Sequence, residues 1–344
     1  MLEPHVLGAF DLFIAVLAAG IISAGLIVVL RPLLQRYALA RPNARSSHTL
    51  PTPQGAGIAV IAATLLATMV WQAINGLAFP LILAGAVLLI AVVGLVDDIR
   101  PIPVLPRLLF QAVAIGAILA TLPSDLRIAT ALPIALERGA ILIAGLWFVN
   151  LVNFMDGLDL MTVAEIVPIT AALILLGWLG TLPALPAIVA ATLCGALLGF
   201  SPFNRPVAKV FLGDVGSLPI GLLVGWCLLA LAFQHHLIAA LLLPLYYLAD
   251  ATLTLLRRMV RGEAFWAAHR THYYQRATDN GLSVSQVVGH VFLLNCVLAA
   301  LAVVSVGLTS PVVDGLALVA GAAAVAYVLL QFLRKRSRQD LRRA

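Results

Sequence analysis

Two asparagines and two aspartates stand together in the segment Asn-Leu-Val-Asn-Phe-Met-Asp-Gly-Leu-Asp, residues 150–159, between two apolar runs. Asp156 and Asp159 are three residues apart, so a helical backbone would place both carboxylates on one face with Asn153. Gly157 between them would let a ligand approach the backbone closely. A helix cap explains one of these aspartates but not the whole group. The segment therefore predicts a polar binding site where an apolar helix ends.

Three further carboxylates lie at the ends of other apolar runs. Asp97 and Asp98 end one run, although acids at a helix C-terminus oppose the helix dipole. Adjacent carboxylates repel each other unless a cation or a shared proton relieves them, so the pair indicates either a divalent metal or a general base. Asp214 lies between glycines and near Ser217 at the start of a run, where a cation could be held beside a bound phosphate. A simple N-cap is the alternative for Asp214.

Two basic clusters complete the set of groups that could carry chemistry. The first, residues 41–57, holds Arg45 and His48 in a Pro- and Gly-rich loop, and both suit an anion. The second, residues 257–281, holds His269, Arg270 and His272, which suit phosphate oxygens. Zinc is the weaker alternative for the two histidines, because no cysteine or Glu-x-x-His pairing lies nearby. Acids for a metal and cations for phosphates together predict phosphoryl transfer.

The rest of the chain must place these groups in a membrane. The protein has 344 residues, is 62% hydrophobic and 10% charged, and has a mean hydropathy of +1.07, which predicts an all-α polytopic integral membrane protein. A spanning helix needs about 20 apolar residues. About eleven segments qualify, with ten as the alternative, and 107–122 and 138–152 are the shortest of them. The segments are residues 8–30, 55–74, 77–96, 107–122, 138–152, 161–180, 184–203, 215–234, 236–256, 286–308 and 311–333.

The basic residues predict the orientation of these spans. With the N-terminus outside, 19 of the 21 Lys and Arg fall on the inner side, and the C-terminus is cytoplasmic. The +6 net charge then follows from topology, so nucleic acid is not an expected partner. We expect residues 1–344 to form a single membrane-embedded domain with short outer loops. All five polar clusters then face the cytoplasm, in loops at about residues 31–54, 97–106, 150–160, 203–214 and 257–285.

The five clusters, in this order, resemble the polyprenyl-phosphate N-acetylhexosamine-1-phosphate transferases of glycosyltransferase family 4. The resemblance covers residue 41 to about residue 281. It lies in Arg-Ser-Ser-His-Thr-Leu-Pro-Thr-Pro-Gln-Gly-Ala-Gly, Val-Asp-Asp, Asn-Phe-Met-Asp-Gly-Leu-Asp, Phe-Leu-Gly-Asp-Val-Gly-Ser and His-Arg-Thr-His-Tyr-Tyr-Gln. The last of these is similar to the form seen in members that initiate O-antigen and exopolysaccharide synthesis. The phospho-N-acetylmuramoyl-pentapeptide transferases carry a triple-His version, so that substrate is the alternative.

The resemblance implies a reaction and a cofactor. Undecaprenyl phosphate and a UDP-N-acetylhexosamine would give undecaprenyl-diphospho-sugar and UMP, with Mg²⁺, or Mn²⁺ in its place, bound at Asp214 and Asn153. Asp97 or Asp98 would deprotonate or orient the lipid phosphate for in-line attack. The resemblance leaves both one displacement and a covalent enzyme intermediate open, and we favour one displacement because no nucleophile stands out from the carboxylates. The enzyme would lie in the bacterial inner membrane with its site on the cytoplasmic face, and a homodimer is compatible with the sequence.

The resemblance also implies which residues bind the substrates. The uridine pocket would be lined by Gly157, Leu158, Asp159 and Asn204, with Phe211 stacking on uracil, while Asn153 and Asp156 shape the site. His48 would contact an anionic group, and His269, Arg270 and His272 would hold the diphosphate or the sugar.

The sequence departs from the family pattern at two positions, and two other classes of protein are alternatives to this family. Leu160 stands where the family usually has glycine, and Gln54 follows the Pro-Thr-Pro where a basic residue is common, which leaves the sugar undetermined. A transporter or lipid-binding membrane protein would instead place ionisable residues near mid-span, and here only Asp250 departs from the interface. A CDP-alcohol phosphotransferase would need an Ala-Arg after the Asp-Gly, which residues 156–162 lack.

Overall fold

The computed structural model describes residues 7–40, 51–264 and 269–336, and about three quarters of these residues are helical. Nine helices in the described ranges are long and apolar enough to cross a bilayer, which confirms the all-α polytopic fold. They are α1 (Ala9–Tyr37), α2 (Gly57–Ile74), α3 (Leu81–Ile99), α5 (Ile134–Met155), α6 (Met161–Trp178), α7 (Ala184–Phe200), α8 (Asp214–Phe233), α12 (Val284–Leu308) and α13 (Pro311–Leu333).

The remaining elements are shorter. They are α4 (Val104–Ala120), α9 (Leu237–Leu242), α10 (Leu245–Val260), α11 (Tyr273–Asp279), the 3₁₀ turn η1 (Ser201–Phe203), and the strands β1 (Leu39–Ala40) and β2 (Thr52–Pro53). The 17 residues of α4 extend over about 26 Å, a little less than a bilayer core.

The prediction of one continuous span over residues 236–256 was wrong. The helix breaks at Leu243 and Pro244, and leaves the six-residue α9 and the amphipathic α10. Proline has no N–H to donate, and its ring clashes with the carbonyl of the preceding turn, so an unbroken helix is disfavoured there. Because α10 carries Asp250, Arg257 and Arg258, this part of the chain is too polar to count as a span.

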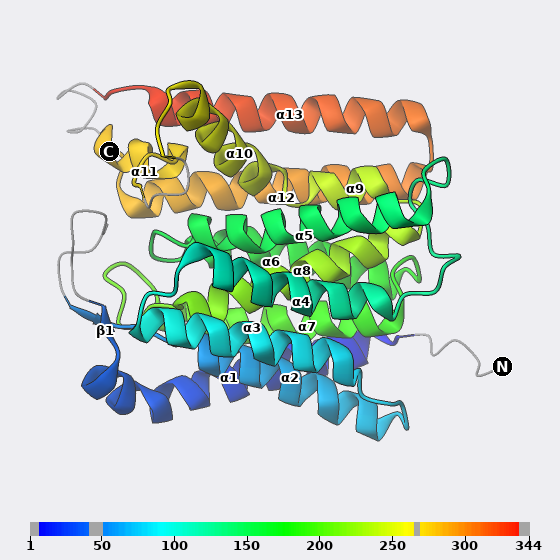
Figure 1. Cartoon of the computed structure of the whole chain (residues 1–344), viewed down its shortest axis with the longest axis horizontal. Coiled ribbons are helices and arrows are strands. Elements are labelled where there is room, and N and C mark those ends of the chain that lie inside the picture. Colours follow the sequence, from blue (N-terminus) through cyan, green and yellow to red (C-terminus); the bar gives the residue numbers. More distant parts are fainter. Residues whose placement is uncertain (1–6, 41–50, 265–268, 337–344) are drawn as a thin grey trace.

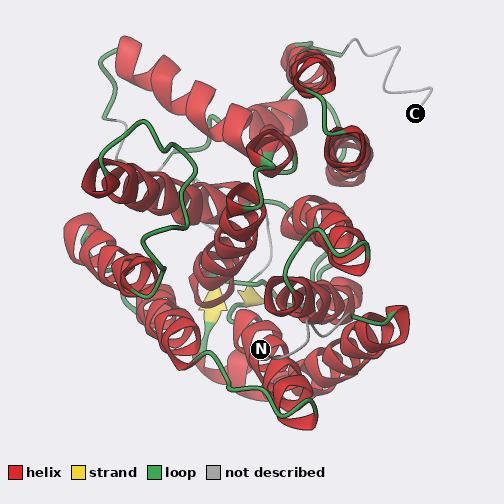
Figure 2. Cartoon of the chain, turned by 90° about the vertical axis from the view of Figure 1, so that its right-hand side faces the viewer, coloured by secondary structure: helices red, strands yellow, loops and turns green. Residues whose placement is uncertain are grey.

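The helices run roughly side by side, with α8 in the middle (Figures 1 and 2). Helices α2, α3, α5 and α7 pack around α8, and 78% of its apolar window is buried. The corresponding share is 28% for α1 and for α5 and 33% for α13, and α1 and α13 lie at opposite edges of the bundle (Figure 1). The first residue of α8 is Asp214, which is therefore held at the end of the most enclosed helix.

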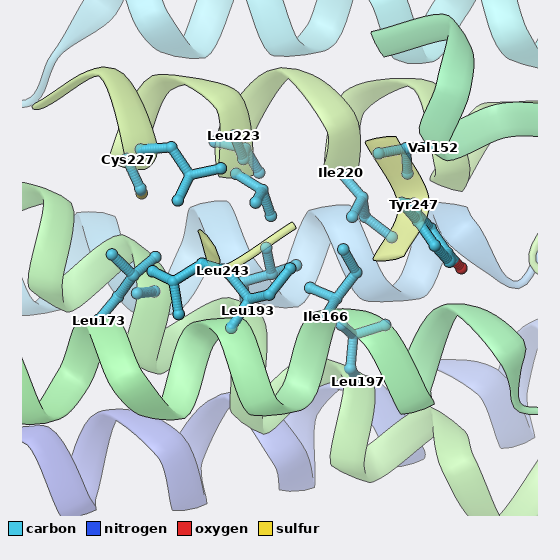
Figure 3. Packing of buried hydrophobic residues seen from close by; sticks show 14 of the residues in the cluster. Val152, Ile166, Leu173, Leu193, Leu197, Ile220, Leu223, Cys227, Leu243 and Tyr247 are labelled. Carbon is cyan, nitrogen blue, oxygen red and sulfur yellow. The ribbon is translucent and has the colours of Figure 1, made fainter. Parts of the chain in front are cut away.

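Apolar side chains from neighbouring helices fill the interior around α8. Figure 3 shows Ile166 and Leu173 of α6, Leu193 of α7, and Ile220 and Leu223 of α8 meeting in one layer. All five side chains are at most 1% exposed. This packing makes the central helices a rigid support for the residues at their ends.

Candidate active site

The N-terminus of α8 is capped by a carboxylate from another helix. Asp98, near the end of α3, accepts hydrogen bonds from the backbone N–H of Asp214 at 2.9 Å and of Val215 at 3.1 Å. Gln54 Nε2 donates a third, short hydrogen bond to the same carboxylate. The first N–H groups of a helix have no partner inside the helix, and a negative charge there also favours the helix dipole. Asp98 therefore fixes the position of Asp214.

A cation lies between the other two predicted catalytic carboxylates. Arg107 Nη1, at the start of α4, is 2.9 Å from Asp97 Oδ2 and 3.7 Å from Asp214 Oδ2. Asp97 also accepts a hydrogen bond from the backbone N–H of Ile102, which closes the turn between α3 and α4. The arrangement offsets the repulsion between two carboxylates with one positive charge.

The segment 150–160 reaches this point from α5. Asn153 Nδ2 donates to Asp214 Oδ1 at 2.7 Å and to Ser217 Oγ at 2.9 Å, so α5 and α8 are joined by one amide. Asp156 caps the end of α5 and accepts a hydrogen bond from the Thr162 hydroxyl. Burial raises the pKa of the Asp156 carboxyl to about 7, against the lowering effect of that hydrogen bond. Asn153 and Asp214 are thus in direct contact, and Asp156 lies three residues after Asn153 in the same segment.

The same segment is tied to residues 201–210 on its other side. Asn204 Oδ1 accepts from Leu160 N–H at 2.7 Å, and Asn204 Nδ2 donates to the Val210 carbonyl at 2.9 Å. Asp159 accepts from the N–H of Ala208 at 3.1 Å. Leu160 has a φ of 63°, in the left-handed region that favours glycine, so the hydrogen bond that its N–H donates to Asn204 stabilises a backbone shape that glycine would adopt freely. Asn204 thus holds the loop in which Leu158 is buried.

The first loop joins the site through backbone hydrogen bonds. β1 and β2 pair antiparallel, with Ala40 opposite Thr52, and Gln54 forms a parallel bridge to Phe211. Phe211 N–H donates to the Pro53 carbonyl at 2.7 Å, and the Phe211 carbonyl accepts from Ala56 N–H at 3.0 Å. Phe211 is therefore positioned by the loop expected to bind an anion. His48, the predicted contact in that loop, lies outside the described residues.

The short helix α11 packs against the glycine of the Asp-Gly segment. Tyr274 Oη donates to the Phe154 carbonyl at 3.1 Å. A Cβ atom at Gly157 would lie 2.1 Å from that hydroxyl oxygen and 3.2 Å from Gln275 Nε2. Glycine at this position is therefore explained by the approach of a protein side chain, whereas the sequence had suggested a ligand there.

The three predicted phosphate-binding residues beside α11 occupy different environments. His272 is 3% exposed and donates from Nδ1 to Asp250 at 3.3 Å, because a carboxylate can only accept. Arg270 pairs with Asp279 at 2.9 Å. Burial, with the nearby charges of His272 and two arginines, lowers the pKa of His269 to about 4, so its imidazole is neutral at pH 7. His269 would serve a diphosphate as a hydrogen-bonding group and not as a cation.

The donor set fits a cation that is completed by substrate. Among the described residues, no three His, Cys, Asp or Glu side chains converge on one point, so they form no cage made of protein alone. Mg²⁺ usually takes one or two carboxylates together with waters and substrate phosphates. Asp214 and Asp97 already flank the positive guanidinium group of Arg107, so part of their negative charge is offset within the protein.

Two residues at the site were not predicted as site residues. Arg107 had been assigned only to the positive-inside pattern, although its place at the start of the helix after the Asp pair could have suggested a role. Tyr274 lies within the His-Arg-Thr-His-Tyr-Tyr-Gln segment but had no assigned contact. Both act on residues far away along the chain, and residue spacing does not reveal such contacts.

Known proteins resemble this chain over most of its length. Residues 80–232 match the family described as glycosyl transferase family 4. The decaprenyl-phosphate N-acetylglucosaminephosphotransferase of Mycobacterium leprae is 27% identical over 82% of this chain and 81% of its own. A probable undecaprenyl-phosphate N-acetylglucosaminyl 1-phosphate transferase of Bacillus subtilis is 25% identical over 85% of each chain. A phospho-N-acetylmuramoyl-pentapeptide-transferase of Streptococcus thermophilus is 34% identical, but over only 32% of this chain.

Proposed function

We propose that the chain, whose residues 80–232 match glycosyl transferase family 4, transfers an N-acetylhexosamine 1-phosphate from a UDP-sugar to a polyprenyl phosphate. In this reaction an oxygen of the lipid phosphate attacks the sugar-bearing phosphorus. The new P–O bond gives the polyprenyl-diphospho-sugar, and the bond from that phosphorus to the oxygen that bridges the two phosphates of the UDP-sugar breaks, so that the bridging oxygen leaves with UMP. The long matches to N-acetylglucosamine phosphotransferases favour this donor over a muramoyl-pentapeptide.

The observation that carries the proposal is an apolar cavity that ends close to the polar site. The cavity has a volume of about 420 Å³ and is lined by side chains of α4, α5, α8, α9 and α10. Along α5 its lining runs from Glu137 to Val149, which is about 18 Å of helix. This depth, and a lining that is almost entirely apolar, suit a hydrocarbon chain.

The cavity and the polar site share one face of two helices. Val149 lines the cavity, and Asn153 follows one helical turn later on α5. On α8, Gly221 lines the cavity, and Ser217 precedes it by one turn. A lipid chain in the cavity would therefore bring its phosphate head to Asn153, Ser217 and Asp214. This supports a lipid phosphate as the acceptor.

The residues at the site suit a transfer between phosphates. Arg107 would neutralise negative charge that develops on the phosphate oxygens, and Asp97 holds Arg107 in place. Asp98 would position α8 and not act as a base, because both of its oxygens accept hydrogen bonds. Mg²⁺, held by Asp214 with Asn153 as its neighbour, would supply charge neutralisation for the diphosphate.

We place this site on the cytoplasmic face of a bacterial inner membrane, where the enzyme would initiate O-antigen or exopolysaccharide synthesis.

Release of UMP tests the proposed reaction. Purified protein with undecaprenyl phosphate, Mg²⁺ and a panel of UDP-N-acetylhexosamines should release UMP with at least one donor. Asp214→Asn should lower this rate by about 100-fold or more, because the Mg²⁺ proposed to neutralise the diphosphate would lose its charged ligand. Its thermal unfolding midpoint in detergent should stay close to that of the wild type. A wild type that releases no UMP with any donor would refute the proposed function.

A bulky residue in the cavity tests the lipid acceptor separately. Ala144 lines the cavity on α5, whereas its neighbour Ile143 is 69% exposed on the lipid-facing side. Ala144→Trp should raise the KM for the polyprenyl phosphate about tenfold and leave the KM for the UDP-sugar unchanged, because it fills space needed by the chain. Ile143→Trp is the matched control and should leave both constants unchanged. Equal behaviour of the two variants would remove the cavity from the acceptor site.

A further inference from the structure

A buried carboxylate on α10 collects hydrogen bonds from both sides of the loop that follows it. Asp250 is 0% exposed. Its Oδ1 accepts from Tyr273 N–H at 2.9 Å, and its Oδ2 accepts from Tyr274 N–H at 3.1 Å. Three side chains also donate to it, which are His272 Nδ1 at 3.3 Å, Thr254 Oγ1 at 3.3 Å and Tyr246 Oη at 3.2 Å.

These contacts place the start of α11 on α10. Tyr273 and Tyr274 are the first two residues of α11, so Asp250 caps this helix from a different helix. Burying a carboxylate is costly unless donors surround it, and here five donors do. An amide in its place would present an N–H group to at least one of those donors. The orientation of α11 therefore depends on this one side chain.

Helix α11 in turn touches the loop of the candidate active site. Tyr274 Oη donates to the Phe154 carbonyl at 3.1 Å, and Gly157 leaves no room between that loop and the ring. Phe154 directly follows Asn153, whose amide donates to Asp214 at 2.7 Å. Asp250 is thus linked to Asp214 through Tyr274 and the segment 153–157, although the two aspartates are 36 positions apart in the sequence.

The same carboxylate orients the histidines beside α11. The His272 ring lies between His269, with centroids 4.9 Å apart, and Tyr274, with centroids 5.7 Å apart. Because His272 Nδ1 donates to Asp250, this carboxylate fixes the orientation of the His272 ring and thereby of the rings stacked on it. His269 lies at the half-buried end of this stack.

We propose that Asp250 is a positioning residue that holds α11. Through Tyr274 of this helix, it keeps the segment 153–157 in the shape that brings Asn153 to Asp214. It acts without touching substrate. Its effect on catalysis rests on the proposed transferase function, whereas its effect on α11 does not.

The isosteric variant Asp250→Asn tests the proposal in the full-length protein in detergent. We expect kcat for UMP release to fall about 100-fold, as for a misplacement of about 1 Å at a catalytic group. We expect amide hydrogen exchange over residues 273–276 to become about tenfold faster, because the cap of α11 is weakened. Glu263→Gln is the matched control: it changes an acid to an amide just beyond the end of the same helix, where Glu263 pairs with Arg258 at 2.9 Å. It should leave both measurements unchanged.

A double-mutant cycle tests whether Asp250 acts through Tyr274. Tyr274→Phe removes only the hydroxyl that donates to Phe154, and we expect kcat to fall about tenfold. Combined with Asp250→Asn, it should add little further loss, because both variants break one path. Additive losses would overturn the proposed path.

The outcomes separate the proposal from the function on which it rests. Wild-type exchange and wild-type kcat in Asp250→Asn would overturn the positioning role. If that variant cannot be purified folded, Tyr274→Phe decides, and an unchanged kcat there overturns the role. If the wild type releases no UMP from any donor, the transferase proposal fails, while the exchange measurement still tests the link between Asp250 and α11.

Discussion

Neighbouring side chains on a helix point about 100° apart. At the end of α3 the adjacent carboxylates of Asp97 and Asp98 therefore have different partners. Asp98 turns toward α8 and accepts two of its N–H groups, whereas Asp97 turns toward Arg107. The sequence predicted that both lie at the site with Asp214. It could not assign their roles, because the direction of each side chain is decided by which helix packs on which side of α3.

The contacts that a side chain makes with residues far away in the sequence were the hardest property of the site residues to predict. Arg107 reaches Asp214 across 107 positions of sequence, and Tyr274 reaches Phe154 across 120. An arginine or a tyrosine at such a place has many other uses in a membrane protein, such as topology or an interfacial anchor. Asn153 and Asp214 could be predicted, because a polar residue at the end of an apolar helix requires an explanation of its own.

The pKa of Asp156 makes the stability of the protein depend on pH. Its carboxyl has a pKa of about 7 in the folded protein, against 3.8 for an unperturbed aspartate. Between these values the folded chain keeps a proton that the unfolded chain has lost, so stability falls as the pH rises from about 4 to about 7 and is then level. We expect the unfolding midpoint of Asp156→Asn to exceed that of the wild type by an amount that grows over this range.

Unfolding of both proteins in detergent, without substrate and at pH 4.5 to 8, checks this expectation. The comparison isolates Asp156, because the other carboxylates are present in both proteins. Wild-type and variant midpoints that run parallel over the whole range would show that Asp156 ionises normally in the folded state.

At the scale of elements, the start of α8 is held by helices that approach its backbone closely. A Cβ atom at Gly57 of α2 would lie 2.2 Å from Gly216 Cα, and one at Gly94 of α3 would lie 2.3 Å from the Asp214 carbonyl oxygen. Both close approaches are possible only because glycine has no side chain. They bring three helices together where Asp98, Asp214 and Gln54 meet.

A methyl group at Gly94 should therefore damage the site, and a second glycine of α3 offers the control. Gly94→Ala forces α3 away from α8 by about 1 Å, which should lower kcat for UMP release by about 100-fold. A Cβ atom at Gly85 would meet no other atom within 4 Å, so Gly85→Ala should keep full activity and stabilise α3 by about 0.5–1 kcal/mol. Activity assays and unfolding midpoints of the two variants measure both effects. Wild-type activity in Gly94→Ala would show that α3 and α8 can separate without harm to the site.

Most elements could be predicted from apolar length, since a bilayer fixes how long a span must be. The exception was residues 236–256, where Pro244 divides an apolar segment and α10 turns amphipathic. Apolar length does not reveal such a break, because a proline inside a spanning helix is often tolerated, as Pro168 is in α6 and Pro219 in α8. The position of α10 depends on its buried Asp250, which needs partners from a later loop.

At the scale of the whole molecule, segments from distant parts of the chain meet at one end of the bundle. Strand β1, helix α11 and the end of α13 lie at the same end, and the start of α1 lies at the other (Figure 1). The turn at Asp125 lies between α4 and α5, at the end of these helices that is far from Arg107 and Asn153. The proposed reaction requires the first end to face the cytoplasm, where UDP-sugars are made available. The distribution of Lys and Arg favours the same orientation.

Cysteine labelling in intact cells tests this orientation. Cys194 and Cys227 are buried, and Cys296 is exposed, so the test uses a Cys296→Ser background. A membrane-impermeant maleimide should label Asp125→Cys in intact cells, because Asp125 is exposed in the turn between α4 and α5. It should label Arg261→Cys, at the exposed end of α10, only after the membrane is opened. The reverse pattern would place Asp97, Asn153 and Asp214 outside the cell, away from nucleotide sugars, and the transferase proposal would then fail on topology alone.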